Sequence, residues 1–132
     1  MGSMLTRDYD TFAEEAKKIC PNRVFTDYLR RYAYGIDASC YSYLPKVVVK
    51  PNNEAEVVEL VLLANRCGTP VTFRAAGSSL SGQASSEDVL IVANDGFKYA
   101  HVLENGNAIR LSCGGIGSDA NAKLAPYGKK IG

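Results

Sequence analysis

A strand, a capped helix and a second strand follow one another in the middle of this chain, and no other feature constrains its fold as strongly. The β-branched run Lys46–Lys50 is typical of a short buried strand. Asn53 can cap a following helix, and Glu56 three residues later completes a pattern that resembles a capping box. Gly68 supplies the stop of that helix before a second strand at residues 71–73. Because a crossover helix joins strands that run parallel, the segment predicts a βαβ unit.

Three helices are expected in the first half of the chain. The first covers Tyr9–Ile19, with Asp10 as its cap and two lysines in its last turn. A short second helix starts at Thr26-Asp27 and runs through Tyr32, and residues 33–45 are expected to form an ordered loop. The helix of the βαβ unit is expected to bury an apolar face made by Val57, Leu60, Val61 and Ala64 and widened by Val58 and Leu62.

The second half of the chain changes from parallel to antiparallel pairing. Val89–Val92 is a third strand of the buried type. The segments Tyr99–Leu103 and Ala108–Cys113 flank Glu104–Asn107, and an Asn-Gly pair between two strands is a strong hairpin signal. A last helix is expected over Ser118–Leu124. A parallel βαβ unit followed by antiparallel strands predicts an α+β fold.

The chain divides into three segments in this interpretation. Residues 1–3 resemble a cloning remnant, residues 4–45 form an N-terminal helical and loop segment, and residues 46–132 form the main domain. The last residues lead from Gly128 to the apolar Ile131 as if toward a further element. We therefore expect the domain to be truncated at its C-terminus.

Composition excludes several classes of protein. Fifteen basic and fourteen acidic residues give a net charge of +1, without the clustered basic face of a nucleic-acid binder. No apolar run is long enough to cross a bilayer, and no secretory signal is present, so a cytoplasmic location is expected. Peripheral attachment of the full-length protein to a membrane stays open. No metal site is expected, because the cysteines lack Cys-x-x-Cys spacing; all four are expected to be reduced, buried thiols: Cys20, Cys40, Cys67 and Cys113.

The segment Arg74–Gln83 is the best candidate for chemistry. It follows a strand directly, at the position where ligands of α/β units gather. Gly77 and Gly82 allow tight turns, and a run of small residues can aim several backbone N–H groups at one anion. Serine hydroxyls and the charge of Arg74 would suit a diphosphate. An ordinary flexible loop has a similar composition, so both interpretations stay open at this point.

Other motifs are weaker. Gly128-Lys129 lacks the first glycine and the Ser or Thr of a P-loop, and we reject it. The spacing from Gly115 to Ala120 fits a loose dinucleotide fingerprint, but glycines that ease a strand-to-helix turn explain it better. His101 is the single histidine and lies in an expected strand. No catalytic residue can be assigned.

From Tyr32 to Gly132 the sequence resembles the FAD-binding domain of the vanillyl-alcohol oxidase and p-cresol methylhydroxylase superfamily (the PCMH-type domain). Within it the likeness is greatest to D-lactate dehydrogenases and glycolate-oxidase-like enzymes. The residues that carry the likeness are Tyr34-Gly35-x-Asp37-Ala38-Ser39, Leu44-Pro45-Lys46-Val47-Val48-Val49 with Pro51, Glu54-Ala55-Glu56-Val57, Gly68-x-Pro70-Val71, Arg74-x-Ala76-Gly77-Ser78-Ser79-Leu80-Ser81-Gly82-Gln83, Gly114-Gly115 and Leu124-x-x-Tyr127-Gly128.

The resemblance implies that this chain is the N-terminal part of the FAD-binding domain: a small parallel βαβ subdomain and the start of an antiparallel subdomain. The cofactor contacts that it implies are Arg74, Ala75, Ala76, Gly77, Ser78, Ser79, Ser81, Gly82 and Gln83, together with Pro51 and Gly115. Ser78 stands where covalently flavinylated members often place histidine, so it implies noncovalent FAD. Ala75 stands where many relatives have glycine, which a negative φ would tolerate.

The resemblance also implies a function for the parent protein, namely oxidation of a D-2-hydroxy acid such as D-lactate or glycolate, with hydride transfer to FAD. Electrons would then pass to a quinone, a cytochrome or an iron–sulfur acceptor. An iron–sulfur cluster would belong only to a C-terminal part outside this chain, and the fragment alone would be inactive. The alternatives are a flavin enzyme with another substrate, a nucleotide-binding module without redox chemistry, and a structural domain.

Overall fold

Three parallel strands and one antiparallel strand form the central sheet of the first structural unit. The computed structural model describes residues 7–36, 43–78, 80 and 82–132. The strand order is β1-β2-β4-β3, in which β1 (Val24–Phe25) runs antiparallel to β2 (Val47–Val49). Strands β4 (Val89–Val92) and β3 (Val71–Arg74) continue in parallel. The predicted βαβ unit is therefore confirmed, whereas the two-residue strand β1 was not predicted.

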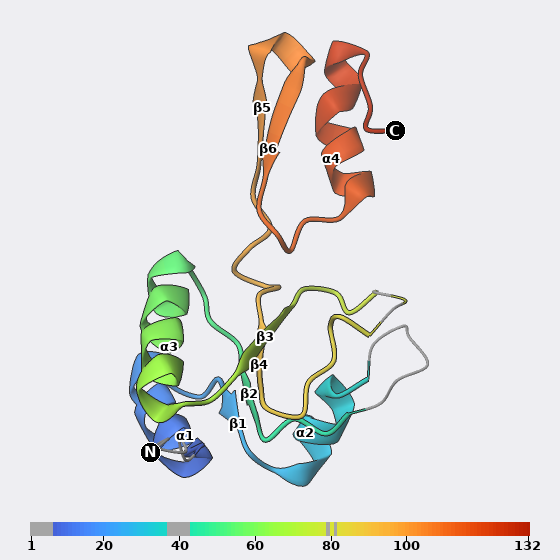
Figure 1. The fold of residues 1–132 in the computed structure, drawn as a ribbon. Coiled ribbons are helices and arrows are strands. Elements are labelled where there is room, and N and C mark those ends of the chain that lie inside the picture. The colour runs from blue at the N-terminus through green and yellow to red at the C-terminus, as the bar shows by residue number, and fades with distance from the viewer. Residues whose placement is uncertain (1–6, 37–42, 79, 81) are drawn as a thin grey trace, which may run out of the picture.

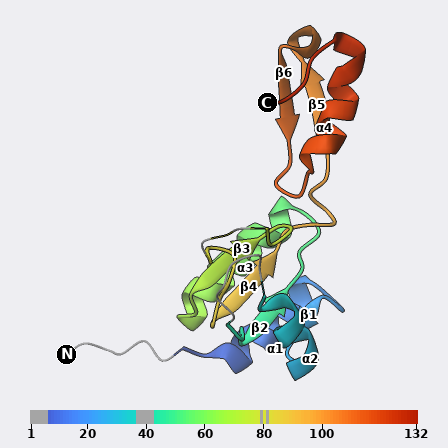
Figure 2. The same ribbon diagram turned by 90° about the vertical axis from the view of Figure 1, so that its right-hand side faces the viewer.

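Helices cover both faces of this sheet (Figures 1 and 2). On one face, α1 (Tyr9–Ile19) and α3 (Glu54–Cys67) pack on alternate residues of β2 and β4 and form the main core. On the other face, α2 (Tyr28–Tyr34) brings Tyr34 against a smaller cluster formed by Val48, Leu90 and Val92. All residues of β2 and β4 are buried, as expected for central parallel strands covered on both sides.

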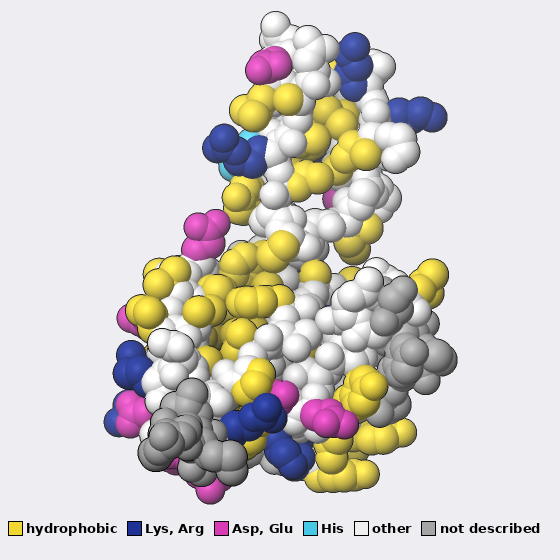
Figure 3. Space-filling view, in the orientation of Figure 1, with side chains coloured by type: hydrophobic (Ala, Val, Ile, Leu, Met, Phe, Trp, Pro, Cys, Tyr) yellow, Lys and Arg dark blue, Asp and Glu magenta, His cyan; other side chains and the backbone are white. Residues whose placement is uncertain are grey.

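The buried face of α3 differs from the predicted one. The residues that contact the core are Leu60, Leu63, Ala64 and Cys67. Val58, Val61 and Leu62 were expected on the buried side, yet they are 58%, 40% and 54% exposed. Leu60 and Ala64 are buried as predicted, so the observed face shares these two residues with the expected one. The helix is apolar around much of its circumference, and spacing alone could not place the other edge of the buried face. Figure 3 shows apolar side chains gathered over α3 and near the junction with the second unit.

Two further expectations about the first helices need correction. The cap of α1 is Asp8, whose side chain accepts a hydrogen bond from the Thr11 amide at 3.0 Å; Asp10 lies in the first turn instead. The α2 helix extends two residues beyond Tyr32, so the expected loop begins later than residue 33. The predicted cap Asn53 of α3 is confirmed, and Asp27, near which the second helix was expected to start, is the cap of α2.

The second unit is a hairpin with a helix packed beside it (Figure 1). Strands β5 (Ala100–Leu103) and β6 (Ala108–Leu111) pair antiparallel, with Leu103 opposite Ala108. A 3-10 turn, η1 (Glu104–Gly106), joins them. Helix α4 (Gly117–Leu124) and the 3-10 turn η2 (Ala125–Tyr127) follow. The predicted hairpin, the last helix and the α+β fold class are confirmed.

Cys20 and Cys67 are buried thiols, as predicted. Cys113 is exposed, which corrects the expectation of burial; it lies beyond the end of β6, in the turn that leads to α4. Cys40 lies outside the described residues. None of the helices in the described part of the chain has the length and apolar character needed to span a bilayer.

Candidate functional site

The carboxyl ends of three parallel strands bring Pro51 and the start of the loop Arg74–Gln83 to one side of the sheet. Strands β2, β4 and β3 lie in that order and run in the same direction. Lys50-Pro51 therefore follows β2 at the side where Ala75 follows β3, with the end of β4 between them. Ligands of open parallel sheets bind at this side, so the topology supports the position predicted for the site.

The loop after β3 contains two left-handed turns. Gly77 has φ +74° and Gly82 has φ +84°, in the region that side chains other than glycine rarely adopt. Ser78 is exposed, and Ala75 is half-buried. Ser79 and Ser81, which were also predicted to contact the cofactor, lie outside the described residues. The predicted need for glycine at two positions of this loop is confirmed by its backbone geometry.

Arg74 extends from the end of β3 toward the end of α2. Its Nη1 donates hydrogen bonds to the carbonyl oxygens of Tyr34 and, at 2.8 Å, of Ile36. The guanidinium carbon also lies 6.0 Å from the centre of the Tyr34 ring. A Cβ at Gly77 would overlap the same guanidinium group. The sequence prediction treated Arg74 as a charge for the ligand and did not foresee these contacts.

Loops after the other two parallel strands pack closely on each other. Pro51 is fully buried, and Lys50 forms an ion pair with Asp95, with 3.1 Å between Nζ and Oδ2. A Cβ at Gly96 would overlap the backbone oxygen of Asn52. Gly96 therefore has a packing reason to be glycine that a search for phosphate motifs could not reveal.

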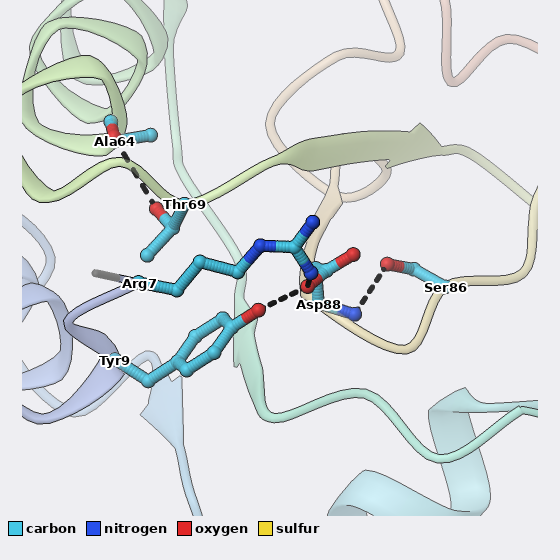
Figure 4. A network of polar contacts seen from close by, with 6 residues as sticks. All are labelled: Arg7, Tyr9, Ala64, Thr69, Ser86 and Asp88. Carbon is cyan, nitrogen blue, oxygen red and sulfur yellow. Dashed lines mark hydrogen bonds and ion pairs between the residues drawn. The ribbon is translucent and has the colours of Figure 1, made fainter. Parts of the chain in front are cut away.

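The segment just before β4, beyond the candidate loop, forms hydrogen bonds and an ion pair with the N-terminal segment (Figure 4). Tyr9 Oη donates to the Asp88 carboxylate, and Arg7 Nη1 lies 3.1 Å from the same Oδ1. The Asp88 amide donates to Ser86 Oγ at 2.9 Å. Burial and the hydrogen bond to Asp88 raise the pKa of Tyr9. Ser85 Oγ, in contrast, is buried without a hydrogen-bond partner among the described residues.

Gly115 lies in the second unit, apart from the other predicted contacts. Its amide donates to the Ser112 oxygen at 3.1 Å in the exposed turn between β6 and α4. This turn is at the end of the second unit that faces the parallel sheet (Figures 1 and 2). No hydrogen bond among the described residues joins Gly115 to Arg74–Gln83.

The described residues contain no group of three or more His, Cys, Asp or Glu side chains that could hold a metal ion. His101 is exposed on β5, with its ring 5.3 Å from that of Tyr99. The described residues therefore offer two left-handed glycines and the cation of Arg74, which suit binding of an anion, and they assign no acid–base residue.

Comparisons with known proteins agree with this geometry. Residues 45–132 match the model of a family described as FAD binding domain. The chain is similar to alkyldihydroxyacetonephosphate synthase (TM-score 0.78, 20% identity), which it matches over 100% of its own length and 27% of the other chain. It is also similar to p-cresol methylhydroxylase with substrate bound (TM-score 0.71, 8% identity, 91% of this chain and 25% of that one).

A third similar structure is 6-hydroxy-D-nicotine oxidase from Arthrobacter nicotinovorans, with a TM-score of 0.67 and 19% identity over 83% of this chain and 24% of that one. The chain thus spans about a quarter of the length of these solved structures. None of the curated proteins compared with the chain matches it. At such identities the likeness to solved structures establishes the fold alone, and the family match over residues 45–132 confirms the expected FAD-binding domain.

Proposed function

This chain belongs to the FAD binding domain family, and from this premise we propose that its loop Arg74–Gln83 binds the diphosphate of FAD. We propose further that the longer protein oxidises a D-2-hydroxy acid and passes the electrons to a quinone, a cytochrome or an iron–sulfur acceptor. The observation that carries the first proposal is the pair of left-handed glycines, Gly77 and Gly82, at the carboxyl side of the parallel strands.

The chemistry of the loop supports the binding of a diphosphate. Gly77 and Gly82 have no Cβ in the way of a ligand, and left-handed turns of this kind can aim backbone N–H groups at an anion. FAD, when bound, would supply the hydride-accepting ring, while the loop would bind and orient its diphosphate.

Noncovalent attachment is the form of binding that the sequence favours. Ser78 stands at the position where a histidine would link to the flavin, and a serine hydroxyl makes no such link here. We propose that Pro51 and Gly115 contact the cofactor from the β2 end and from the second unit. The contact proposed for Pro51 is supported by its position directly after the carboxyl end of β2. The contact proposed for Gly115 is supported by its position in the turn that faces the sheet.

The first experiment is a visible absorption spectrum of the complete reading frame that contains these residues. We expect flavin bands in the wild type and their loss in Gly77→Leu, because a side chain at 77 is strained and collides with Arg74. Gly68→Leu is the matched control: Gly68 has a similar φ of +66° but ends α3, away from the loop. Folded wild-type protein that is colourless after incubation with FAD and removal of the unbound flavin would refute the proposal and favour a nucleotide-binding or structural module.

The substrate is the part of the proposal with the least support from the structure. The similar structures are named as enzymes for different compounds, among them a nicotine derivative and p-cresol. Anaerobic mixing of the flavin-loaded protein with D-lactate, glycolate and an aldonolactone would distinguish the classes. Bleaching of the flavin bands by the hydroxy acids, with L-lactate as the control, is the expected result. Bleaching by the aldonolactone alone would overturn the D-2-hydroxy acid assignment.

A further inference from the structure

Arg74 joins three segments that lie far apart in the sequence. It is the last residue of β3, opposite Val92 of β4, and its side chain extends over the sheet face that α2 covers. There Nη1 bridges two backbone carbonyls, those of Tyr34 and Ile36. The last carbonyls of a helix lack partners within the helix and carry partial negative charge, which a guanidinium stabilises. Arg74 thus fixes the end of α2 to the end of β3.

The end of α2 is held from the other side as well. The Tyr34 ring stacks on Phe25 of β1, with centroids 6.3 Å apart and planes 8° from parallel. Lys50 Nζ lies 5.7 Å from the centre of the same ring. Although burial lowers the pKa of Lys50, its hydrogen bonds to Asp95 and Tyr34 outweigh this and raise it. These contacts hold the Tyr34 side chain in place, and the hydrogen bond from Arg74 to the Tyr34 carbonyl links β3 to this fixed residue.

The candidate loop turns back against this anchored guanidinium. At Gly77 a Cβ would overlap Nε, Cζ and Nη2 of Arg74, so the backbone of the left-handed turn passes directly beside the plane of the guanidinium. The guanidinium is planar and rigid. Its N–H donors point outward along the edge of the plane, and its flat face is free to pack against the turn. A lysine ammonium has the charge but neither the plane nor the fork.

We propose that Arg74 is a positioning residue: it holds the Gly77 turn in its anion-binding shape by linking it to the end of α2. In this role Arg74 donates its hydrogen bonds to the carbonyls of Tyr34 and Ile36, not to the diphosphate. It would strengthen cofactor binding indirectly, by holding the backbone of the loop in place. The inference rests on the proposed function and deepens it, because it replaces direct charge on the diphosphate with preorganisation of the loop.

The test compares Arg74→Lys and Arg74→Gln in the complete reading frame, with the exposed Arg110→Gln on β6 as control. Two quantities are measured: the Kd for FAD, and amide hydrogen exchange of residues 75–78 in protein from which flavin has been removed. A positioning role predicts that both Arg74 variants weaken FAD binding by about tenfold, the size of one hydrogen bond with a charged group. It also predicts faster exchange of the loop without cofactor in both variants.

A direct role in binding phosphate predicts a different result. Arg74→Lys would then keep nearly the wild-type Kd, and exchange of residues 75–78 would be unchanged in flavin-free protein. That outcome would overturn the inference while leaving the proposed function intact. If the wild type binds no FAD, the proposed function fails, yet the exchange rates still test whether Arg74 holds the loop. If Arg74→Gln does not fold, Arg74→Lys decides, since it keeps the aliphatic stem and the charge.

Discussion

Glu56 shows how one side chain can serve a helix end and a buried thiol together. Its Oε2 accepts a hydrogen bond from the Asn52 amide at 2.6 Å. In a capping box it would instead accept from the amide of the cap residue, Asn53. The same oxygen lies 3.5 Å from Cys20 Sγ at the end of α1. Burial, together with the neighbouring Glu56 charge, raises the pKa of Cys20 from 9.0 to about 12. The Cys20 thiol therefore stays neutral in the folded protein at neutral pH.

This raised pKa predicts a pH dependence of stability. Above pH 9 the thiol ionises in the unfolded chain but stays protonated in the folded one, until about pH 12. The folded state then binds more protons, so the free energy of unfolding should fall as pH rises through this range. Urea unfolding of wild type, Cys20→Ala and Cys113→Ala at pH 8, 9 and 10 checks this. The decline should be smaller in Cys20→Ala than in Cys113→Ala; equal declines would contradict it.

At the scale of elements, α3 shows that a cap and a stop can be predicted more securely than a face. Asn53 and Gly68 interact only with residues close to them in the sequence. The Asn53 side chain accepts a hydrogen bond from the Glu56 amide at 2.9 Å, and Gly68 ends the helix with φ +66°. The buried face instead depends on how α3 lies on the sheet and against α1. Because α3 has apolar residues on several sides, its sequence does not determine which side is buried, and tertiary packing decides it.

The corrected face can be tested with two leucines of the same helix. Leu60 is fully buried, and Leu62 is 54% exposed. Leu60→Ala should lower the free energy of unfolding by about 2–5 kcal/mol, since it leaves a cavity in the main core. Leu62→Ala should change it by less than about 0.5 kcal/mol. Urea unfolding measures both, and a larger loss from Leu62→Ala would show that the helix is buried on its other side.

At the scale of the molecule, the two units meet where the turn after β6 returns to the segment that connects β4 with β5. The Gly114 amide donates to the Phe97 oxygen at 2.8 Å, and the Ser112 amide donates to the Tyr99 oxygen at 3.1 Å. Phe73 is 48% exposed and lines an apolar groove beside this junction. The position of Gly115 relative to the loop after β3 therefore depends on a connection only a few residues wide.

This connection predicts unequal effects of two alanine substitutions. A Cβ at Gly114 would lie 2.5 Å from the Asn94 oxygen and 2.7 Å from the Phe97 oxygen, both of them backbone atoms. Gly114→Ala should therefore destabilise the protein by about 1–3 kcal/mol. Gly117 begins α4 with open space around a Cβ, so Gly117→Ala should be neutral or stabilise by about 0.4–1 kcal/mol. Thermal unfolding separates the two, and equal melting temperatures would contradict the close packing at Gly114.

The sequence by itself determined the features that depend on neighbouring residues. These are the strands around Val48 and Leu90, the cap Asn53, the hairpin turn at Asn105-Gly106, and the need for glycine at 77. Backbone sterics and local hydrogen bonds act within a few residues, so a linear pattern records them. The family resemblance added the FAD-binding domain, which the match over residues 45–132 confirms.

The tertiary structure alone decided the features that depend on distant residues. Strand β1 forms because Val24 and Phe25 pair with β2. Two residues are too few for their pattern in the sequence to predict a strand. Gly96 is required by the backbone of Asn52, and Arg74 is directed to a carbonyl forty positions earlier in the chain. Such contacts form only after packing has brought separate segments together, because close approach and hydrogen-bond geometry are properties of that packing.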